Sequence, residues 1–425
     1  MSAITAQSSK SRAARSAGSV LLLGNYRATI ACARALKALD FHVIVGVADD
    51  LHGGAENSRA CDETWAHPAA DDPEALAAAL NRLLARRPDI SVVYPVAEDY
   101  VRFVTARRAD LPAHVVYAVT DAHSVNTLLA KAKAFDLARD AGVPVAPYRV
   151  VDNIDTLFAA ARDIGWPVVV KPNASGRRIG DDKIILARDA DDLRRQLTGW
   201  PDGQPDLMVQ RCVSGDRYNA YFAARHAQMI RLMIERTSRT DRADGSGLAV
   251  AGVTIPPDPA LTGYTRALIE KLGYNGIGCA QFMVDADGEV NFLEINPRID
   301  GNHALAERAG LGLTQLAIAL AADAADAEPW REGQIGLRYV WTHGELGGLL
   351  ASLRNGSLRG LAIPLASLRL LVSALRADMH LTWSWRDPRP TLDAYLGSLA
   401  RLVGRSPGKP RRGPSNMAAR PNPNR

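Results

Sequence analysis

Apolar and polar positions follow two alternating patterns along the first hundred residues. Short, largely apolar runs at 20–25, 41–47 and 90–95 predict buried strands of a parallel sheet. Amphipathic stretches at 28–39 and 73–85 lie between these runs and predict helices. Strands that alternate with helices are typical of a doubly wound parallel sheet, so this region is predicted to be a Rossmann-like α/β unit.

The pattern changes after a predicted helix at 124–141, which ends at Gly142 and is followed by Pro144. Single strands are predicted at 167–171, 183–186 and 206–212. Two hairpins are predicted from paired apolar segments joined by short turns, at 218–224 with 228–235 and at 278–284 with 289–295. This part is therefore predicted to be an α+β unit of antiparallel strands flanked by helices.

Residues 330–400 contain mixed apolar segments with four tryptophans and are predicted to form a small C-terminal unit. The most apolar stretch, 361–375, includes Pro364 and Arg369, so we interpret it as a buried helix rather than a membrane span. The predicted organisation is a disordered segment 1–17, units at 18–123, 124–328 and 329–403, and a disordered basic tail at 404–425.

Composition fits a cytoplasmic protein. The chain has 425 residues, of which 47% are hydrophobic and 23% charged. Its four cysteines are scattered without ligand spacing, which favours reduced thiols over a zinc site. The net charge of +5 comes from the tails, because residues 401–425 carry seven basic side chains and no acid. The body is mildly acidic, which argues against a nucleic-acid partner.

The first candidate cluster follows the predicted strand at 167–171. Lys171 ends the strand, and a loop with Ser175, Gly176 and Gly180 follows it. Backbone N–H groups of such a loop can surround phosphate oxygens, with the lysine as a nearby charge. Taken alone, an ordinary hairpin loop with an exposed lysine explains the same pattern. Lys131, on the preceding helix, would by itself be read as a solvated surface residue.

The segment 208–218 is a second candidate, because a strand edge offers backbone donors and acceptors to an adenine ring. A plain strand-turn-strand accounts for it equally well.

A third cluster carries the metal hypothesis. Glu294 and Asn296 lie two residues apart on a predicted strand, so both side chains face the same side. Gln281, on the other strand of the hairpin, is placed to join that face. Oxygen ligands of this kind suit Mg²⁺, which retains waters and bridges phosphates. Arg298 follows the strand and is placed to hold an anion. The alternative is a surface turn with a capping asparagine.

In their order along the chain, these residues resemble the ATP-grasp superfamily over about 18–330. The most specific element is Phe-Leu-Glu-Ile-Asn-Pro-Arg at 292–298. The chain is similar to the biotin carboxylase and carbamoyl phosphate synthetase branch, and closer to stand-alone predicted ATP-grasp carboligases. The resemblance implies a Rossmann-like pre-ATP-grasp domain, an ATP-grasp domain and a small C-terminal unit.

The resemblance also implies roles for residues. ATP with Mg²⁺ or Mn²⁺ is the implied cofactor set, with metal ligands Gln281, Glu294 and Asn296 and a catalytic Arg298 at the acyl-phosphate site. Residues implied to contact ATP are Lys131, Lys171, Ser175, Gly176, Gln210, Arg211, Val213 and Tyr218. At position 210 the family more often has glutamate.

Departures from the family pattern narrow the activity. Biotin carboxylases have a glutamate where this chain has Asn302, and the D-alanine ligase type of metal motif is absent. The implied function is an ATP-dependent ligase that activates a carboxylate as an acyl phosphate for attack by an amine or similar nucleophile. Small-molecule substrates, no membrane span and possible homodimerisation accompany this prediction. The alternative is a non-catalytic nucleotide-binding or regulatory protein that retains the fold.

Overall fold

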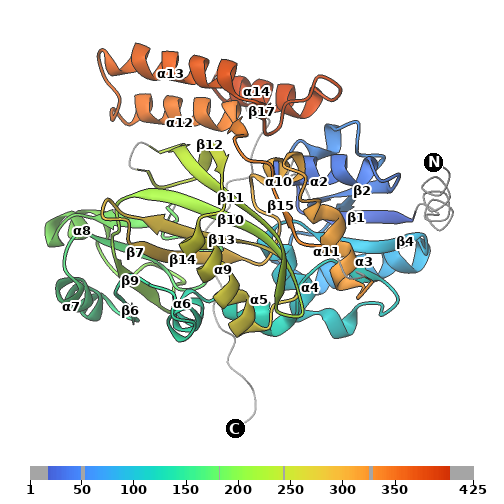
Figure 1. Cartoon of the computed structure of the whole chain (residues 1–425), viewed down its shortest axis with the longest axis horizontal. Coiled ribbons are helices and arrows are strands. Elements are labelled where there is room, and N and C mark those ends of the chain that lie inside the picture. The colour runs from blue at the N-terminus through green and yellow to red at the C-terminus, as the bar shows by residue number, and fades with distance from the viewer. Residues whose placement is uncertain (1–17, 49–52, 181, 243–244, 325–328, 403–425) are drawn as a thin grey trace, which may run out of the picture.

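A computed structural model describes residues 18–48, 53–180, 182–242, 245–324 and 329–402, which form three β-sheets with helices on and between them (Figure 1). The segments 1–17 and 404–425 that the sequence predicts to be disordered lie outside the described residues. The mixture of a parallel sheet and antiparallel sheets confirms the predicted fold class.

The N-terminal sheet has five parallel strands in the order β3-β2-β1-β4-β5. All the strands and helices predicted before residue 100 are present. The sequence missed β3, β5 and α4, because β3 is a half-exposed edge strand without an apolar run and β5 has only two residues. The elements are β1 (Ser19–Leu23), α2 (Arg27–Lys37), β2 (His42–Ala48), β3 (Glu63–His67), α3 (Pro73–Arg86), β4 (Ile90–Pro95), α4 (Glu98–Ala106) and β5 (Val116–Tyr117).

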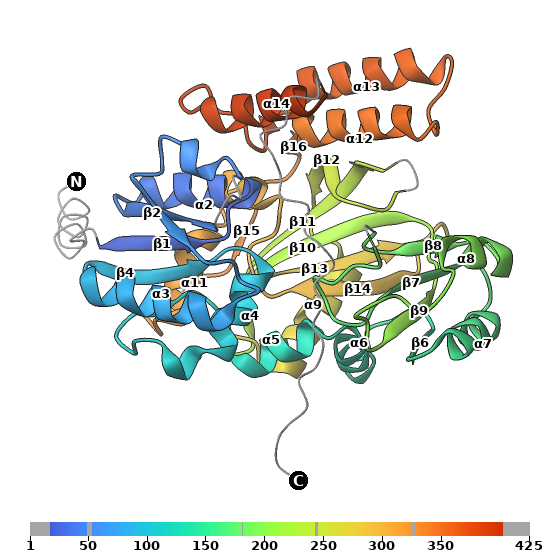
Figure 2. The same ribbon diagram turned by 180° about the vertical axis from the view of Figure 1, so that it is seen from behind.

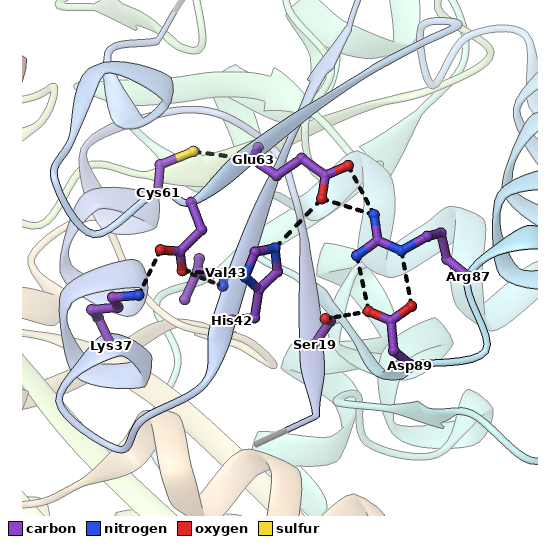
Figure 3. Close-up of polar contacts among 9 residues, drawn as sticks. Ser19, Lys37, His42, Val43, Cys61, Glu63, Arg87 and Asp89 are labelled. Carbon is purple, nitrogen blue, oxygen red and sulfur yellow. Dashed lines mark hydrogen bonds and ion pairs between the residues drawn. The ribbon is translucent and has the colours of Figure 1, made fainter. Parts of the chain in front are cut away.

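Polar side chains connect the amino ends of these strands (Figure 3). The Arg87 guanidinium donates to both carboxylate oxygens of Asp89, at 2.8 and 2.9 Å, and to Glu63 Oε2 at 2.8 Å. Ser19 Oγ donates to Asp89 at 2.6 Å, and these bonds hold the pKa of Asp89 well below its usual value. Ligands bind at the opposite, carboxyl edge of such sheets, so this cluster is structural.

A four-stranded sheet in the order β6-β9-β7-β8 forms the middle of the chain. Strand β7 pairs with β9 so that Lys171 lies opposite Met208 and Val169 lies opposite Gln210. The predicted strands are confirmed within a few residues. The elements are β6 (Tyr148–Val151), α7 (Ile154–Ile164), β7 (Val168–Pro172), β8 (Ile185–Ala187), α8 (Ala190–Gln196) and β9 (Leu207–Arg211).

The largest sheet has eight strands, in the order β14-β13-β10-β11-β12-β16-β17 with β15 beside β11. Both predicted hairpins are confirmed as the antiparallel pairs β10–β11 and β13–β14. The elements are β10 (Asp216–Arg225), β11 (Gln228–Thr240), β12 (Ala249–Ile255), α9 (Pro259–Leu272), β13 (Gly276–Val284), β14 (Val290–Asn296), α10 (His303–Arg308), α11 (Leu313–Ala321), β15 (Arg331–Glu332), β16 (Arg338–Val340) and β17 (Met379–His380). Since β15 and β16 pair with this sheet, the domain division at 328 stays a prediction.

One apolar core joins the N-terminal sheet to the large sheet. It contains Val20 and Tyr94 from the parallel strands, Tyr221 and Cys279 from β10 and β13, and Leu316 from α11. Helices α10 and α11 therefore lie between the two sheets, as both views show (Figures 1 and 2). Each fully buried aliphatic side chain contributes roughly 1.5–3 kcal/mol, so this shared core fixes how the two sheets are placed.

The single helix predicted at 124–141 is wrong, because the chain forms two helices, α5 (Ala122–Leu128) and α6 (Lys131–Asp140). Between them, Ala130 adopts an extended conformation and forms a β-bridge with Ala174. A tertiary contact thus replaces a turn of helix, and it places Lys131 at the first position of α6 rather than inside a helix.

Three C-terminal helices lie at one end of the molecule: α12 (Thr342–Arg354), α13 (Ala362–Arg376) and α14 (Arg389–Leu402). The prediction that 361–375 forms a helix is confirmed, but the prediction that it is buried is wrong. None of the residues of α13 is buried, and Leu361 and Leu375 are 88% and 76% exposed. Within the described ranges, no helix is long and apolar enough to cross a bilayer.

A glycine in the large sheet provides a test of its packing. A Cβ at Gly252 of β12 would lie 2.1 Å from Glu235 Oε1 and 2.6 Å from the Arg236 carbonyl oxygen. Gly252→Ala is expected to lower the free energy of unfolding by about 3 kcal/mol through overpacking. Gly263→Ala, in helix α9 with no neighbouring atom within 4 Å, serves as the control. It should raise stability slightly, by roughly 0.5–1 kcal/mol. Urea unfolding of both variants measures the difference, and equal effects would contradict the packing.

Candidate active site

Two lysines lie close together where the four-stranded sheet meets α6. Asn173, two residues after Lys171, explains why. Its carbonyl oxygen accepts from the Lys131 backbone N–H at 3.0 Å, and its side-chain oxygen accepts from the Ala132 N–H at 3.0 Å. The first N–H groups of a helix have no partner within the helix, so Asn173 caps α6. This cap brings the loop after β7, and with it Lys171, against the start of α6.

The environment of the two lysines favours a polyanionic ligand. Burial, reinforced by the charge of Lys131, lowers the pKa of Lys171 to about 7, although Glu294 opposes the shift. Burial also lowers the pKa of Lys131, with Glu294 and Glu98 opposing. Lys171 Nζ donates to Gln210 Oε1 at 2.8 Å. Two adjacent cations with little neutralising charge gain most from a ligand such as a phosphate chain.

Glu294, Asn296 and Gln281 come together on one face of the β13–β14 hairpin. Gln281 is the cross-strand partner of Glu294, so their side chains are neighbours. Asn296 Nδ2 donates to Glu294 Oε1 at 3.2 Å. No group of three His, Cys, Asp or Glu suited to a metal occurs in the described part of the chain. One carboxylate with two amides fits Mg²⁺, which takes its remaining ligands from water and phosphates.

The same row of side chains continues across the large sheet. Gln281 is also the cross-strand partner of Asn219 in β10, and Asn219 is the partner of Glu235 in β11. Glu235 is fully buried and accepts hydrogen bonds from Asn219, from Thr237 and, at 2.9 Å, from the Tyr339 hydroxyl. Burial raises the pKa of Glu235 to about 7. The sequence analysis missed this row, because it predicted the hairpin at 218–224 with 228–235 but not which residues pair across it.

Arg298 lies near the same face, where it contacts the neighbouring Asn296 and the distant Glu98. Its Nη2 donates to Asn296 Oδ1 at 3.3 Å and lies 3.8 Å from Glu98 Oε2 of helix α4. Ser175 Oγ donates to the same Glu98 oxygen at 3.0 Å. A Cβ at Gly176 would lie 3.2 Å from Glu98 Oε1. Glu98, which the sequence analysis did not select, therefore connects the loop after β7 to Arg298.

Arg27, from the start of α2, completes the surroundings of Arg298. Its Nη2 donates to Asn302 Oδ1 at 3.0 Å, and its guanidinium carbon lies 3.9 Å from the Trp341 ring centroid. Burial would raise the pKa of Asp300, but the Asn302 N–H and the charges of Arg298 and Arg27 outweigh burial and leave it lowered. Within the described residues, Arg27 Nη1 and Arg298 Nε are buried without a hydrogen-bond partner. Two such donors suit an anionic ligand.

Three residues predicted to contact ATP do not join this cluster through their side chains. Arg211 Nη2 donates to the Ile164 carbonyl oxygen at 2.6 Å, away from Lys171. Val213 is half-buried in the loop between β9 and β10. Tyr218 packs against the apolar core that contains Phe135 and Phe282, on the sheet face opposite to Asn219.

A family model described as "ATP-grasp in the biosynthetic pathway with Ter operon" matches residues 204–344. A D-alanine–D-alanine ligase of Pseudomonas fluorescens is 28% identical over 227 residues, which cover 49% of this chain and 68% of the ligase. A biotin carboxylase of Halalkalibacterium halodurans is 24% identical over 263 residues, covering 56% of this chain and 55% of the enzyme. This chain thus matches about two thirds of the first relative and about half of the second.

The fold is similar to that of the biotin carboxylase domain of a Hydrogenobacter thermophilus 2-oxoglutarate carboxylase, solved with MgADP, ADP and bicarbonate. The TM-score is 0.58 at 18% identity, over 75% of this chain and 72% of that one. The family model over 204–344 and the two relatives show that the chain is similar to ATP-grasp enzymes of the carboxylase and ligase branch. The solved structure shows that the fold is shared.

The buried Lys171 predicts how stability varies with pH. Its folded pKa of about 7 lies below the usual 10.5, so between these values the unfolded chain binds the extra proton. The free energy of unfolding should therefore rise by about 3 kcal/mol between pH 7 and pH 9.5, and this gain should be absent below pH 7. Lys171→Met should flatten the slope. Lys133→Met, at an exposed lysine of the same helix α6, should leave it unchanged. Urea titrations at pH 7 and 9.5 measure it, and an unaltered slope in Lys171→Met would refute the assignment.

Proposed function

We propose that this chain is an ATP-dependent ligase that activates a carboxylate as an acyl phosphate, which an amine or similar nucleophile then attacks. The observation that carries the proposal is the convergence of the buried Lys171, the half-buried Lys131, the Gln281–Glu294–Asn296 face and Arg298 at one junction. These residues come from three separate parts of the fold and occur in the order expected for ATP-grasp enzymes.

In this proposal the phosphates of ATP are bound by Lys131 and Lys171, whose pKa values are lowered chiefly by burial. Glu294, Asn296 and Gln281 would hold Mg²⁺, which supplies charge neutralisation to the phosphate chain. Support comes from the donor set itself and from the relative solved with MgADP. The loop with Ser175 and Gly176 would cover the phosphates and exclude water.

The chemistry needs positioning and charge stabilisation rather than a protein nucleophile. A carboxylate oxygen of the acid attacks the γ-phosphorus, the bond to the β,γ-bridging oxygen breaks, and ADP leaves. The amine lone pair then attacks the acyl carbon, phosphate departs and the amine loses a proton. Arg298 faces this region with a buried, unpartnered Nε and would stabilise the anionic acid or its acyl phosphate.

The two relatives do not choose the substrates. Asn302 occupies the position of a biotin carboxylase glutamate, and here it bonds to Arg27 and Tyr339. The metal motif also lacks the D-alanine ligase pattern. The domain boundaries, the homodimer and the cytoplasmic location stay predictions.

Calorimetry of MgATP binding tests the site. The wild type should bind ATP only with Mg²⁺, and Glu294→Ala should weaken binding at least about tenfold, because the one carboxylate of the metal face is lost. Glu289→Ala makes the same change in the exposed turn of the same hairpin and should bind as the wild type does. Folding of each variant is checked by circular dichroism.

Two outcomes would overturn the proposal. A folded wild type that binds no ATP would exclude the nucleotide site. ATP binding without ADP release, over a broad screen of acids and amines, would instead favour the non-catalytic nucleotide-binding alternative.

A further inference from the structure

The exposed apolar side chains of this protein are concentrated on its C-terminal helices. In the described residues, large apolar side chains with high exposure number thirteen, and nine of them lie between 361 and 399. These nine are Leu361, Leu365, Leu368, Leu371, Leu375, Trp385, Leu392, Leu396 and Leu399. Soluble surfaces rarely gather apolar residues in this way without a partner. Figures 1 and 2 show α13 as the outermost of the three helices.

The spacing shows that the leucines form stripes. They recur at intervals of three and four residues along α13, starting at its N-cap: Leu361, Leu365, Leu368, Leu371 and Leu375. On α14 the same intervals separate Leu392, Leu396 and Leu399. Residues at these intervals share one face of a helix. The opposite side of α13 packs on α12, so the face that a globular helix normally buries is here turned to solvent.

The charge beside these stripes has one sign. The segment 354–376 contains Arg354, Arg359, Arg369 and Arg376 and no acidic residue. Elsewhere on the C-terminal helices and their loops, Glu345, Asp378 and Asp387 are each paired with an arginine, which leaves Asp393 on α14. The chain that follows α14 adds further basic residues and no acid. The surface is therefore apolar and cationic.

A cleft of about 500 Å³ runs between α13 and strands β11, β12 and β16. Four arginines line it: Arg239 and Arg338, which are paired with Glu345 and Asp378, and Arg369 and Arg376. The last two make no hydrogen bond or ion pair within the described residues. Leu368 and Val372 supply apolar wall beside them. Free guanidinium groups beside leucines can bind an anionic group that is attached to an apolar molecule.

We propose that the face formed by α13, α14 and this cleft docks on the surface of an anionic phospholipid bilayer. The leucines would enter the interface between headgroups and acyl chains, while Arg369 and Arg376 would reach the lipid phosphates. A helix with arginines flanking a leucine face lies in the plane of a bilayer surface, and anionic lipids strengthen its binding. No membrane span is required.

Charge argues against two other occupants. A second copy of the same face would bring arginines of α13 against arginines, because that helix has no acid to pair with them. Nucleic acid would meet leucines at the centre of the face, whereas its binding surfaces are polar and charged. A bilayer satisfies both the apolar and the cationic groups at once.

Cosedimentation of the full chain with vesicles tests this inference independently of any enzymatic activity. The chain should bind vesicles of phosphatidylcholine with about one third phosphatidylglycerol, and should bind pure phosphatidylcholine much less. The triple variant Leu361→Ser, Leu375→Ser and Leu396→Ser should bind at least about tenfold more weakly, because its most exposed leucines no longer enter the bilayer. Arg369→Gln with Arg376→Gln should reduce the preference for the anionic lipid.

A matched control variant removes the same number of exposed apolar side chains as the leucine variant does. Val150→Ser, Leu248→Ser and Ile335→Ser remove three exposed apolar side chains from other surfaces and should leave vesicle binding unchanged. A leucine variant that binds like the wild type would overturn the proposal, since the basic tail alone would then account for binding. A wild type that binds neither vesicle would also overturn it. A third contradicting result would be a wild type that sediments as a dimer and binds no vesicles, together with a leucine variant that sediments as a monomer.

Discussion

The buried ammonium group of Lys171 sets the constraint around which the candidate site is arranged. A cation in an apolar sheet is costly unless polar or acidic groups surround it. Here Gln210 accepts its hydrogen bond, Glu294 lies near enough to favour its charge, and Lys131 opposes that charge. Strands from two different sheets and the start of α6 must therefore meet at one point. The balance still leaves the pKa of Lys171 low, so the protein alone does not neutralise the site, and a phosphate ligand would.

Apolar packing far from Lys171 brings the elements of the candidate site together. The apolar core shared by the parallel sheet and the large sheet contains residues of α2 and β13, with α10 and α11 packed on α2. Arg27 and Glu98, at the starts of helices α2 and α4 of the N-terminal unit, lie near Asp300 and Arg298 respectively. Glu98 bonds to Ser175 of the phosphate-side loop and lies near Arg298, so a movement of that loop changes the surroundings of the arginine. The N-terminal sheet thus contributes directly to the proposed acyl site.

The C-terminal segment connects this site to the outer surface. Strand β16 pairs with β12, and Tyr339 on β16 donates to the buried Glu235, in the same row as the proposed metal face. Helix α13 follows from the same segment and carries the leucine stripe. A surface that docks on a bilayer through α13 and α14 would therefore hold the large sheet, and the site on it, in a fixed orientation to that bilayer. Ligation and membrane attachment would then be properties of one rigid unit.

The sequence by itself determined most of the strands, both hairpins and which side chains of the 292–298 motif share a face. Apolar runs located β1, β2 and β4, the paired segments gave both hairpins, and the two-residue spacing of Glu294 and Asn296 placed both on one face, because these depend on neighbours along the chain. Only the tertiary structure decided the rest. The break between α5 and α6 results from the bridge of Ala130 to Ala174. Helix α13 is exposed because few other elements pack on it. The Glu294–Gln281–Asn219–Glu235 row and the approach of Arg27 and Glu98 to Arg298 depend on strand register and on packing between distant segments, which local pattern does not specify.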